Sequence, residues 1–279
     1  KHMNLGTLTL VATPIGNLSD ISPRAVEALQ AADVVCCEDT RRTGLLLQHL
    51  GISGKKYIVI NEHTEHDACE DVVQRILGGS NVALVSDAGT PGISDPGERL
   101  VKAALSSGIT VSAMPGASAL TMALVMSGLS TSRFVFEGFL PRSGAERTQR
   151  IAGIVDEQRT VVLYEAPHRL EKTLVDLELS CGALRRVVLA RELTKMHEEM
   201  WRGTLHDAVK HSQQVEPRGE YVVLLEGAKP PAPPTDEEIT AALRDEMNNG
   251  SSKKDAAAKV AAKFGAPKRK VYELALMLK

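Results

Sequence analysis

The sequence predicts an α/β protein that consists of two consecutive α/β domains and a small helical extension. Short β-branched runs alternate with amphipathic segments along most of the chain, which is typical of a largely parallel sheet covered by helices. The alternation restarts near residue 118 and stops at a proline-rich stretch, GAKPPAPPTDEE. At 279 residues and 43% hydrophobic, the chain is long enough to build two separate cores.

The N-terminal α/β domain is expected over residues 4–117. Ser22 followed by Pro23 is typical of an N-cap with proline in the first helical turn, and Gly51, Gly78 and Gly108 fall where helices should end. Apolar runs predict strands, and the amphipathic segments between them predict helices. The strands are expected within 7–14, 33–39, 57–63, 81–87 and 109–116, and the helices within 22–32, 43–51, 70–79 and 97–108.

The C-terminal α/β domain is expected over residues 118–228, and its alternating pattern begins after the apolar segment ASALTMALVMSG. Its strands are predicted within 134–139, 159–166, 185–194 and 221–227, and its helices within 146–157, 169–179 and 205–214. Residues 229–235 are predicted to form a semi-rigid linker because they are rich in proline. Three short helices are expected in the extension, 236–279, and the turn KFGAPKRK between the last two resembles a helix-turn-helix.

Composition excludes several classes of protein. No apolar run reaches the roughly 18–20 residues that span a bilayer, and no secretory signal is recognisable, so we expect a cytoplasmic protein without a membrane partner. We expect no metal site, because Cys36, Cys37, Cys69 and Cys181 form no C-x-x-C pair and no Cys/His cluster. The formal net charge of −2 gives no global indication of nucleic acid, so an RNA partner has to be argued from local patches.

Irregular turns follow several predicted strands, and most of them contain glycine or proline. The richest is SDAGTPGISDPG at 86–97, and MPGASAL, YEAPHRL and ARELTK share the design. The first strand leads into VATPIGNLSDIS, where Gly16 is the only glycine, so the G-x-G-x-x-G pattern of an ordinary dinucleotide site is missing. Ligands of α/β proteins bind at the carboxyl ends of strands, and the turns therefore predict one cleft between the two domains.

Eight segments resemble, in order and spacing, the ribosomal RNA small subunit methyltransferase I family. They are TLVATPIGNLSDIS, EDTRRTGLLLQHLGI, ALVSDAGTPGISDPG, PGASAL, FEGFLPR, YEAPHRL, ARELTK and GEYVVLLEG. That family is part of the tetrapyrrole methylase superfamily, the class III S-adenosylmethionine methyltransferases. The resemblance implies a homodimer whose subunits bind S-adenosylmethionine between two α/β domains of the tetrapyrrole methylase type. It also implies the reaction, 2′-O-methylation of a cytidine in the decoding region of small-subunit (16S) ribosomal RNA, with that RNA or the 30S particle as partner.

The resemblance places the cofactor on a set of residues carried over one at a time by motif position. Within the richest turn, either Asp87 or Asp95 is expected to accept from the methionine amino group or from a ribose hydroxyl. For Asp95, the alternative is an N-cap with Pro96 in the first turn of the next helix. The cofactor residues implied by the family are Pro14, Asp87, Ala88, Gly89, Ile93, Ser118, Ala119, Tyr164 and Glu165, with Thr194 and Tyr221 as weaker transfers.

The sequence does not single out the general base that a ribose hydroxyl needs. The candidates at predicted strand ends are Glu38, Asp39, Glu137, Glu192 and Lys195, each of which has a structural ion pair or hydrogen bond as its alternative role. Lys195 qualifies only if burial or a neighbouring cation lowers its pKa.

Basic residues are the candidates for RNA phosphates. Residues 251–279 carry eight basic side chains against two acidic ones, a net charge of +6, which suits docking on ribosomal RNA; the alternative is a solvated cap packed on the dimer. The candidates are Arg41, Arg42, Arg142, Arg147, Lys268, Arg269 and Lys270.

Three functions follow from these patterns. The first is the ribosomal RNA 2′-O-methyltransferase. The alternative is a small-molecule methylase with a tetrapyrrole-type substrate, which the missing G-D-P loop of such relatives and the basic tail argue against. The third is a cofactor-sensing RNA-binding or assembly protein without turnover.

Overall fold

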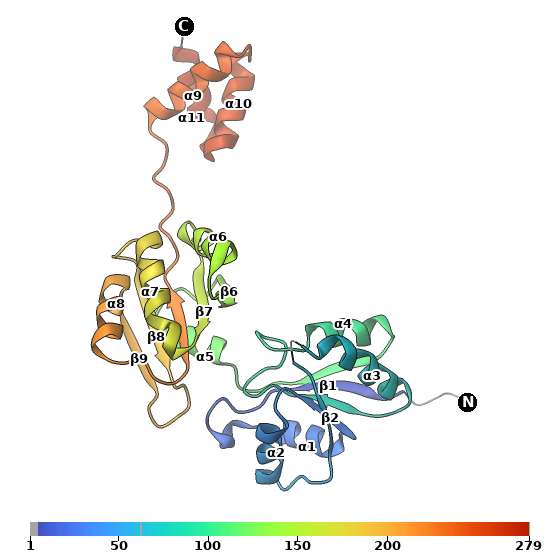
Figure 1. Ribbon diagram of the computed structural model, residues 1–279. Helices are drawn as coiled ribbons and strands as arrows, with labels where there is room; N and C mark the ends of the chain where they lie inside the picture. The colour runs from blue at the N-terminus through green and yellow to red at the C-terminus, as the bar shows by residue number, and fades with distance from the viewer. Residues whose placement is uncertain (1–4, 62, 279) are drawn as a thin grey trace. The chain divides into compact units, whose positions relative to one another are not determined.

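A computed structural model describes residues 5–61 and 63–278; residues 4, 62 and 279 of the predicted ranges lie outside the described residues. The chain divides into two units, one up to residue 228 and one from residue 229 (Figure 1). Both expected α/β domains fall inside the first unit, and the boundary at 117/118 stays a prediction.

The first sheet has five strands, all parallel, as the alternating pattern predicted. In spatial order they are β3 (Lys56–Val59), β2 (Val34–Cys37), β4 (Val82–Leu84), β1 (Thr7–Val11) and β5 (Thr110–Met114). Their carboxyl ends lie along one edge, so the turns after β1, β2, β4 and β5 meet there.

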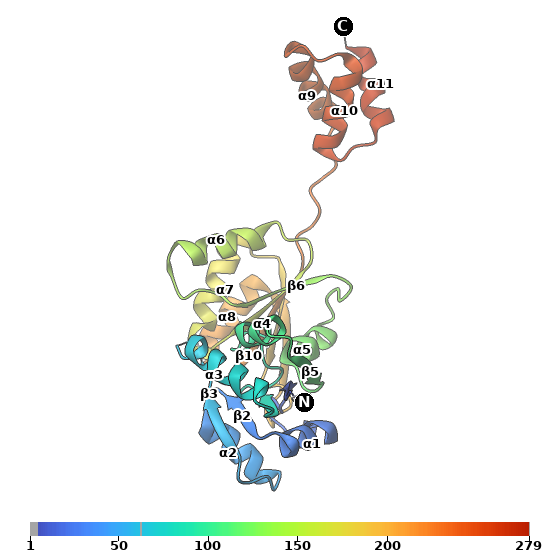
Figure 2. The same ribbon diagram turned by 90° about the vertical axis from the view of Figure 1, so that its right-hand side faces the viewer.

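Helices cover both faces of this sheet because its central strands are apolar on both sides. Cys36 and Leu84 pack with α3 (Glu65–Leu77) and α4 (Glu98–Ser106), whereas Cys37 and Val35 pack with α1 (Pro23–Ala31) and α2 (Thr40–His49). Both views show the two helix pairs on opposite faces (Figures 1 and 2). A short 3₁₀ turn, η1 (Leu18–Asp20), precedes α1.

The expected start of α1 and the expected helix ends are confirmed in this half, whereas α2 and α3 begin at Thr40 and Glu65, before the expected 43 and 70. Ser22 caps α1, with its hydroxyl accepting from the amide of Ala25 at 3.1 Å, and Pro23 is the first helical residue. Gly78 is the C-cap of α3, and Gly51 and Gly108 follow the C-caps of α2 and α4 with φ of +70° and +71°. Only glycine adopts this conformation without strain.

The second sheet is mixed. Its order is β6 (Phe134–Phe139), β7 (Thr160–Glu165), β10 (Tyr221–Leu225), β8 (Arg186–Arg191) and β9 (Glu199–Thr204), and only β6 and β7 are parallel. Strand β9, EMWRGT, was not predicted: it is a half-exposed edge strand with little apolar alternation. One face packs against α6 (Gly144–Val155), α7 (Pro167–Cys181) and α8 (Leu205–Gln214), and the other against α5 (Ala119–Ser127).

Residues 229–279 have a core of their own. Helices α9 (Asp236–Asn248), α10 (Lys253–Phe264) and α11 (Lys268–Met277) bury Leu243, Val260 and Val271 together. Thr235 forms a capping box with Glu238 at the start of α9, and Gly265 ends α10 in the left-handed conformation. The three predicted helices are confirmed. Among the described residues, no helix combines the length and the apolarity that crossing a membrane requires.

Candidate functional site

The turn at residues 86–97 is fixed against the turns after β1 and β5. Thr13 and Gly89 exchange two backbone hydrogen bonds of 3.0 Å, and the Thr90 hydroxyl donates to the carbonyl of Ala117 at 3.2 Å. Gly89 has φ +82°, and a Cβ there would lie 3.2 Å from Cγ2 of Ile15. Three strand ends of the first sheet are thereby held together.

The opposite wall comes from the second sheet. Tyr164, near the end of β7, contacts Phe136 and Phe139 edge to face, with ring centroids 4.9 and 5.7 Å apart. Its hydroxyl accepts from the amide of Leu120 at 3.2 Å, in the first turn of α5. Phe139 remains 49% exposed, so an aromatic ring stands at the mouth of the site.

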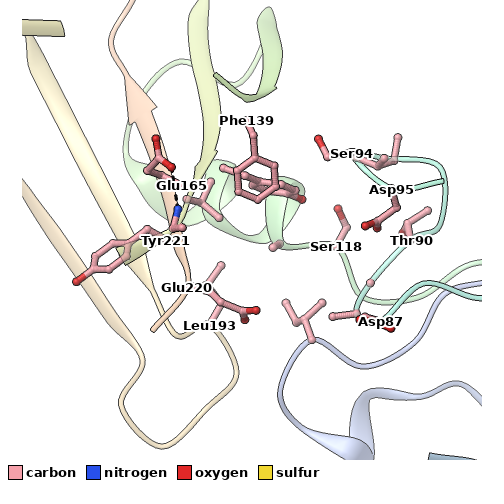
Figure 3. A pocket seen from close by; sticks show the side chains of 18 of the residues that line it. Asp87, Thr90, Ser94, Asp95, Ser118, Phe139, Glu165, Leu193, Glu220 and Tyr221 are labelled. Atoms are coloured by element: carbon pink, nitrogen blue, oxygen red, sulfur yellow. Dashed lines mark hydrogen bonds between the residues drawn. The ribbon is translucent and has the colours of Figure 1, made fainter. Parts of the chain in front are cut away.

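Between the two walls lies a cavity of about 390 Å³, within the size range of about 300–1,000 Å³ that is usual for small ligands (Figure 3). Of the residues expected to bind the cofactor, nine line it: Asp87, Ala88, Gly89, Ile93, Ser118, Ala119, Tyr164, Glu165 and Tyr221. Pro14 and Thr194 are not among its lining residues, although Ile15 is.

Two of these nine residues direct their side chains mainly at other parts of the protein rather than into the cavity. Glu165 is buried, and it accepts from the hydroxyl of Thr173 at 2.6 Å and from the amide of Ala166 at 2.9 Å, so its carboxylate ties β7 to α7. The ring of Tyr221 points away from the turn that carries Asp87 (Figure 3) and packs in the other core, with Val223. Alternation along β10 gives Tyr221 and Val223 the same face, opposite to Val222.

The wall formed by the first sheet is acidic. Oδ1 of Asp87 is buried and has no hydrogen-bond partner within the described part of the chain, while Oδ2 lies 3.8 Å from Nε of Arg42. Asp95 also lines the cavity, and burial, together with the charges of Glu38 and Asp87, raises the pKa of its carboxyl to about 7. It is not the helix cap, because α4 begins at Glu98 after Gly97.

The five general-base candidates differ in whether they line the cavity. Glu38 lines the cavity and the other four do not. Asp39 caps α2 and binds Arg41, which lowers its pKa to about 2. Glu137 forms an ion pair with Arg150, with Nε and Oε2 2.7 Å apart.

Lys195 and Glu192 form an ion pair of 3.1 Å, and Lys195 also binds Glu220 at 2.8 Å. Burial alone lowers the pKa of Lys195, but its bonds to Glu220 and Glu192 outweigh burial and raise it, so the condition for Lys195 as a base is not met. Burial raises the pKa of Glu192, but hydrogen bonds from the Glu220 amide and Lys195 lower it overall. Lys195 and Glu192 therefore bind each other and are not among the lining residues, whereas their partner Glu220 is.

The arginines proposed to contact RNA in the first unit differ in their exposure. Arg42 lines the cavity, and Arg41 and Arg142 are exposed. The side chain of Arg147 is only 6% exposed, and its guanidinium donates to Asp176, Thr173 and the carbonyl of Pro141. This burial removes Arg147 from the RNA-binding candidates. It lies on the buried face of α6 with Ile151 and Ile154, four and seven residues further along the helix.

Sequence reasoning missed several lining residues: Ile15, Thr90, Ser94, Phe139, Ala166, Pro167, Leu193, Glu220 and Val222. Most stand next to a motif that had been singled out, so taking whole turns rather than matched positions would have found them. Among the described residues, no cluster of His, Cys, Asp and Glu is arranged to hold a metal ion.

Known proteins resemble the chain over nearly its whole length. The tetrapyrrole (corrin/porphyrin) methylase family model matches residues 7–209, and a model described as the RsmI C-terminal HTH domain matches residues 233–279. Ribosomal RNA small subunit methyltransferase I of Synechocystis sp. is 46% identical over 276 residues, 98% of this chain and 99% of that protein. The protein of the same name from Pseudomonas aeruginosa is 46% identical over 280 residues, 98% of each chain.

Solved structures support the fold. The methyltransferase CobJ superimposes with a TM-score of 0.61 at 18% identity, covering 80% of this chain and 95% of that one. Uroporphyrin-III C-methyl transferase from Thermus thermophilus, complexed with S-adenosyl homocysteine, gives a TM-score of 0.56 at 18% identity, covering 79% and 97%.

Proposed function

Since the chain belongs to the ribosomal RNA small subunit methyltransferase I family, within the tetrapyrrole methylases, we propose that it methylates the 2′-hydroxyl of a cytidine in the decoding region of small-subunit (16S) ribosomal RNA. It is an S-adenosylmethionine-dependent methyltransferase. The observation that carries the proposal is the cavity between the two sheets, lined by nine of the eleven expected cofactor residues.

The cavity fits S-adenosylmethionine chemically. When bound, this cofactor supplies a methyl group activated by a positively charged sulfur. Oδ1 of Asp87 is buried and has no partner among the residues that the structure describes, so it suits a hydrogen-bond donor or a positive charge, and Gly89 lets backbone approach the ligand closely. Ser118 stands at the N-terminal end of α5, where backbone amides favour a carboxylate such as that of the methionine moiety. Alignment of the two reactants is the main contribution expected of this chain, and it can be worth about 7–11 kcal/mol.

An RNA substrate is supported by the charges around the site and by the extension. Arg42 lines the cavity and Arg41 lies beside it in the first turn of α2 with a side chain 88% exposed. In the extension, Lys268, Arg269 and Lys270 open α11, and all three are exposed. Arg269 and Lys270 bind Glu273 and Asp236 in exposed ion pairs, which cost little to exchange for phosphate.

Replacing Lys268, Arg269 and Lys270 together by glutamine is expected to weaken binding to small-subunit RNA. Each lost phosphate contact makes the slope of log affinity against log salt shallower by about 0.7–0.9, so losing all three should make it shallower by about 2.1–2.7. Fluorescence anisotropy at several salt concentrations measures both quantities. The matched control replaces Lys56, Lys102 and Lys210, which are exposed in the first unit, and should leave the slope near the parent value. A parent-like slope in the α11 variant would show that α11 does not contact RNA.

The remaining partner and location assignments are parts of the same proposal. A cytoplasmic location follows from a ribosomal RNA substrate. The homodimer is implied by the family resemblance, and the molar mass measured by light scattering tests it.

Methyl transfer from tritiated S-adenosylmethionine tests the reaction against its alternatives. The acceptors are free small-subunit RNA, assembled 30S subunits from a strain lacking this gene, and a tetrapyrrole. The proposal predicts label in RNA or 30S subunits. Label only in the tetrapyrrole favours the small-molecule methylase, and cofactor binding by calorimetry without transfer favours a binding protein without turnover.

A further inference from the structure

Asp95 stands in the cavity wall on a turn that the fold holds in a strained conformation. Ser94, the preceding residue, has φ +56°. The bulged end of β6 closes on it: a Cβ at Gly138 would lie 2.6 Å from the hydroxyl oxygen of Ser94. On the other side, the amide of Gly97 donates to Oε1 of Glu65 at 3.2 Å. Strain of this kind persists only where surrounding contacts impose it, and it is common at functional sites.

The carboxylate of Asp95 is directed from this turn toward the space in front of Ser118 (Figure 3). It differs from three of the acidic candidates, because Asp39, Glu137 and Glu192 bind basic side chains outside the cavity, whereas Glu38 lines the cavity as Asp95 does. The groups that share its surroundings are the carboxylates of Glu38, Asp87 and Glu65, the guanidinium of Arg42 near Asp87, and the hydroxyls of Ser86 and Tyr164.

We propose that Asp95 is the general base of the methyl transfer, accepting the proton of the ribose 2′-hydroxyl. The inference rests on the proposed function. The O2′–H bond breaks and its proton moves to a carboxylate oxygen of Asp95. The electron pair left on O2′ forms the bond to the methyl carbon. The pair of the methyl–sulfur bond stays on sulfur, so that neutral S-adenosylhomocysteine leaves.

The electrostatics suit this role. Burial and the neighbouring charges of Glu38 and Asp87 raise the pKa of Asp95 to about 7, while a hydrogen bond with Ser86 acts in the opposite direction. A general base works best when its pKa lies near the operating pH, because it is then both ionised and basic enough to take the proton. Asp39, with a pKa of about 2, is a much weaker base.

The variant Asp95→Asn tests the role through the pH dependence of single-turnover transfer. In the parent protein, the rate should rise about tenfold per pH unit below pH 7 and level off above it, because only the carboxylate accepts the proton. Asp95→Asn should lower the plateau by about 10²–10⁴-fold and lose this rise. Asp67→Asn, at a side chain 98% exposed on α3, is the matched control and should keep the parent curve.

Two further measurements do not depend on turnover. The variant should bind S-adenosylhomocysteine within about threefold of the parent, because a base for the RNA hydroxyl does not hold the cofactor. A raised carboxyl pKa in the folded protein makes stability fall as pH rises from about 4 to about 7, since the unfolded chain releases its proton first. Asp95→Asn should therefore raise the melting temperature more at pH 8 than at pH 4.5.

A second variant, Glu38→Gln, tests whether the charge of Glu38 contributes to the raised pKa of Asp95. Removing this neighbouring charge should move the midpoint of the rate curve to lower pH while the rise itself is retained. The inference is overturned if Asp95→Asn keeps the parent rate and curve, or if Glu38→Gln abolishes the rise and Asp95→Asn does not. It is also overturned if Asp95→Asn loses more than about tenfold in S-adenosylhomocysteine affinity and an equal factor in rate at every pH, which marks a cofactor ligand. An inactive parent protein is a different result, which contradicts the proposed function itself.

Discussion

Arg147→Ala is expected to lower the free energy of unfolding by about 3 kcal/mol, at the lower end of the range for breaking a buried ion pair. The guanidinium binds Asp176 with Nη2 and Oδ2 2.7 Å apart, and it also binds Thr173 and the carbonyl of Pro141. Removing it takes this donor from Asp176 and Thr173 of α7, while the carbonyl of Pro141 still accepts from Arg169 at 3.2 Å. In a protein of this size, the melting temperature should fall by roughly 6–12 °C, which calorimetry measures.

The matched control is Arg142→Ala, at an exposed arginine five residues earlier. It should change the melting temperature by no more than a surface substitution does, within about 0.5 kcal/mol. An unchanged melting temperature for Arg147→Ala, combined with weaker RNA binding, would restore Arg147 as an RNA contact.

Gly89→Val is expected to reduce the affinity for S-adenosylhomocysteine by about 10–100-fold. A β-branched residue at φ +82° is strained by roughly 1–3 kcal/mol, and its Cβ would lie 3.2 Å from Cγ2 of Ile15, in the wall of the cavity. Relief of that strain would have to shift the paired backbone of Thr13 and Gly89. Each 1.4 kcal/mol lost from the bound state costs about tenfold in affinity, which isothermal calorimetry reports directly.

The variant Gly54→Val separates the effect of backbone strain from the effect of a side chain in the cavity wall. Gly54 has φ +72°, but none of the described residues has an atom within 4 Å of an added Cβ there, and it does not line the cavity. This variant should lose stability through backbone strain and keep its affinity. If Gly89→Val binds S-adenosylhomocysteine as the parent does, the turn at 86–97 is not the cofactor wall.

Local patterns predicted the elements of this fold well. Ser22 with Pro23, and the glycines after α2, α3 and α4, mark helix ends because capping and left-handed backbone are properties of a few neighbouring residues. The position of the cavity could also be predicted. A parallel sheet brings the carboxyl ends of its strands to one edge, and the turns at those ends line the cavity.

What the sequence could not predict depends on tertiary packing. Arg147 shares the buried side of α6 with Ile151 and Ile154, and that it meets a carboxylate there depends on α7 placing Asp176 opposite it. The capping alternative for Asp95 failed because the turn continues to Gly97 before α4 begins. The orientation of Tyr221 could have been predicted from the sequence, because period-two alternation assigns it to the face of Val223 rather than that of Val222.

The measurement that tests the central claim most directly is the identity of the methylated nucleoside. Small subunits or their RNA from a strain lacking this gene are incubated with the purified protein and S-adenosylmethionine carrying a heavy methyl group, digested to nucleosides, and analysed by mass spectrometry. The predicted product is cytidine that carries the heavy methyl on O2′ of the ribose, from a fragment of the decoding region. A heavy methyl found only on a base, or on no nucleoside although calorimetry shows that the cofactor binds, would contradict the assignment.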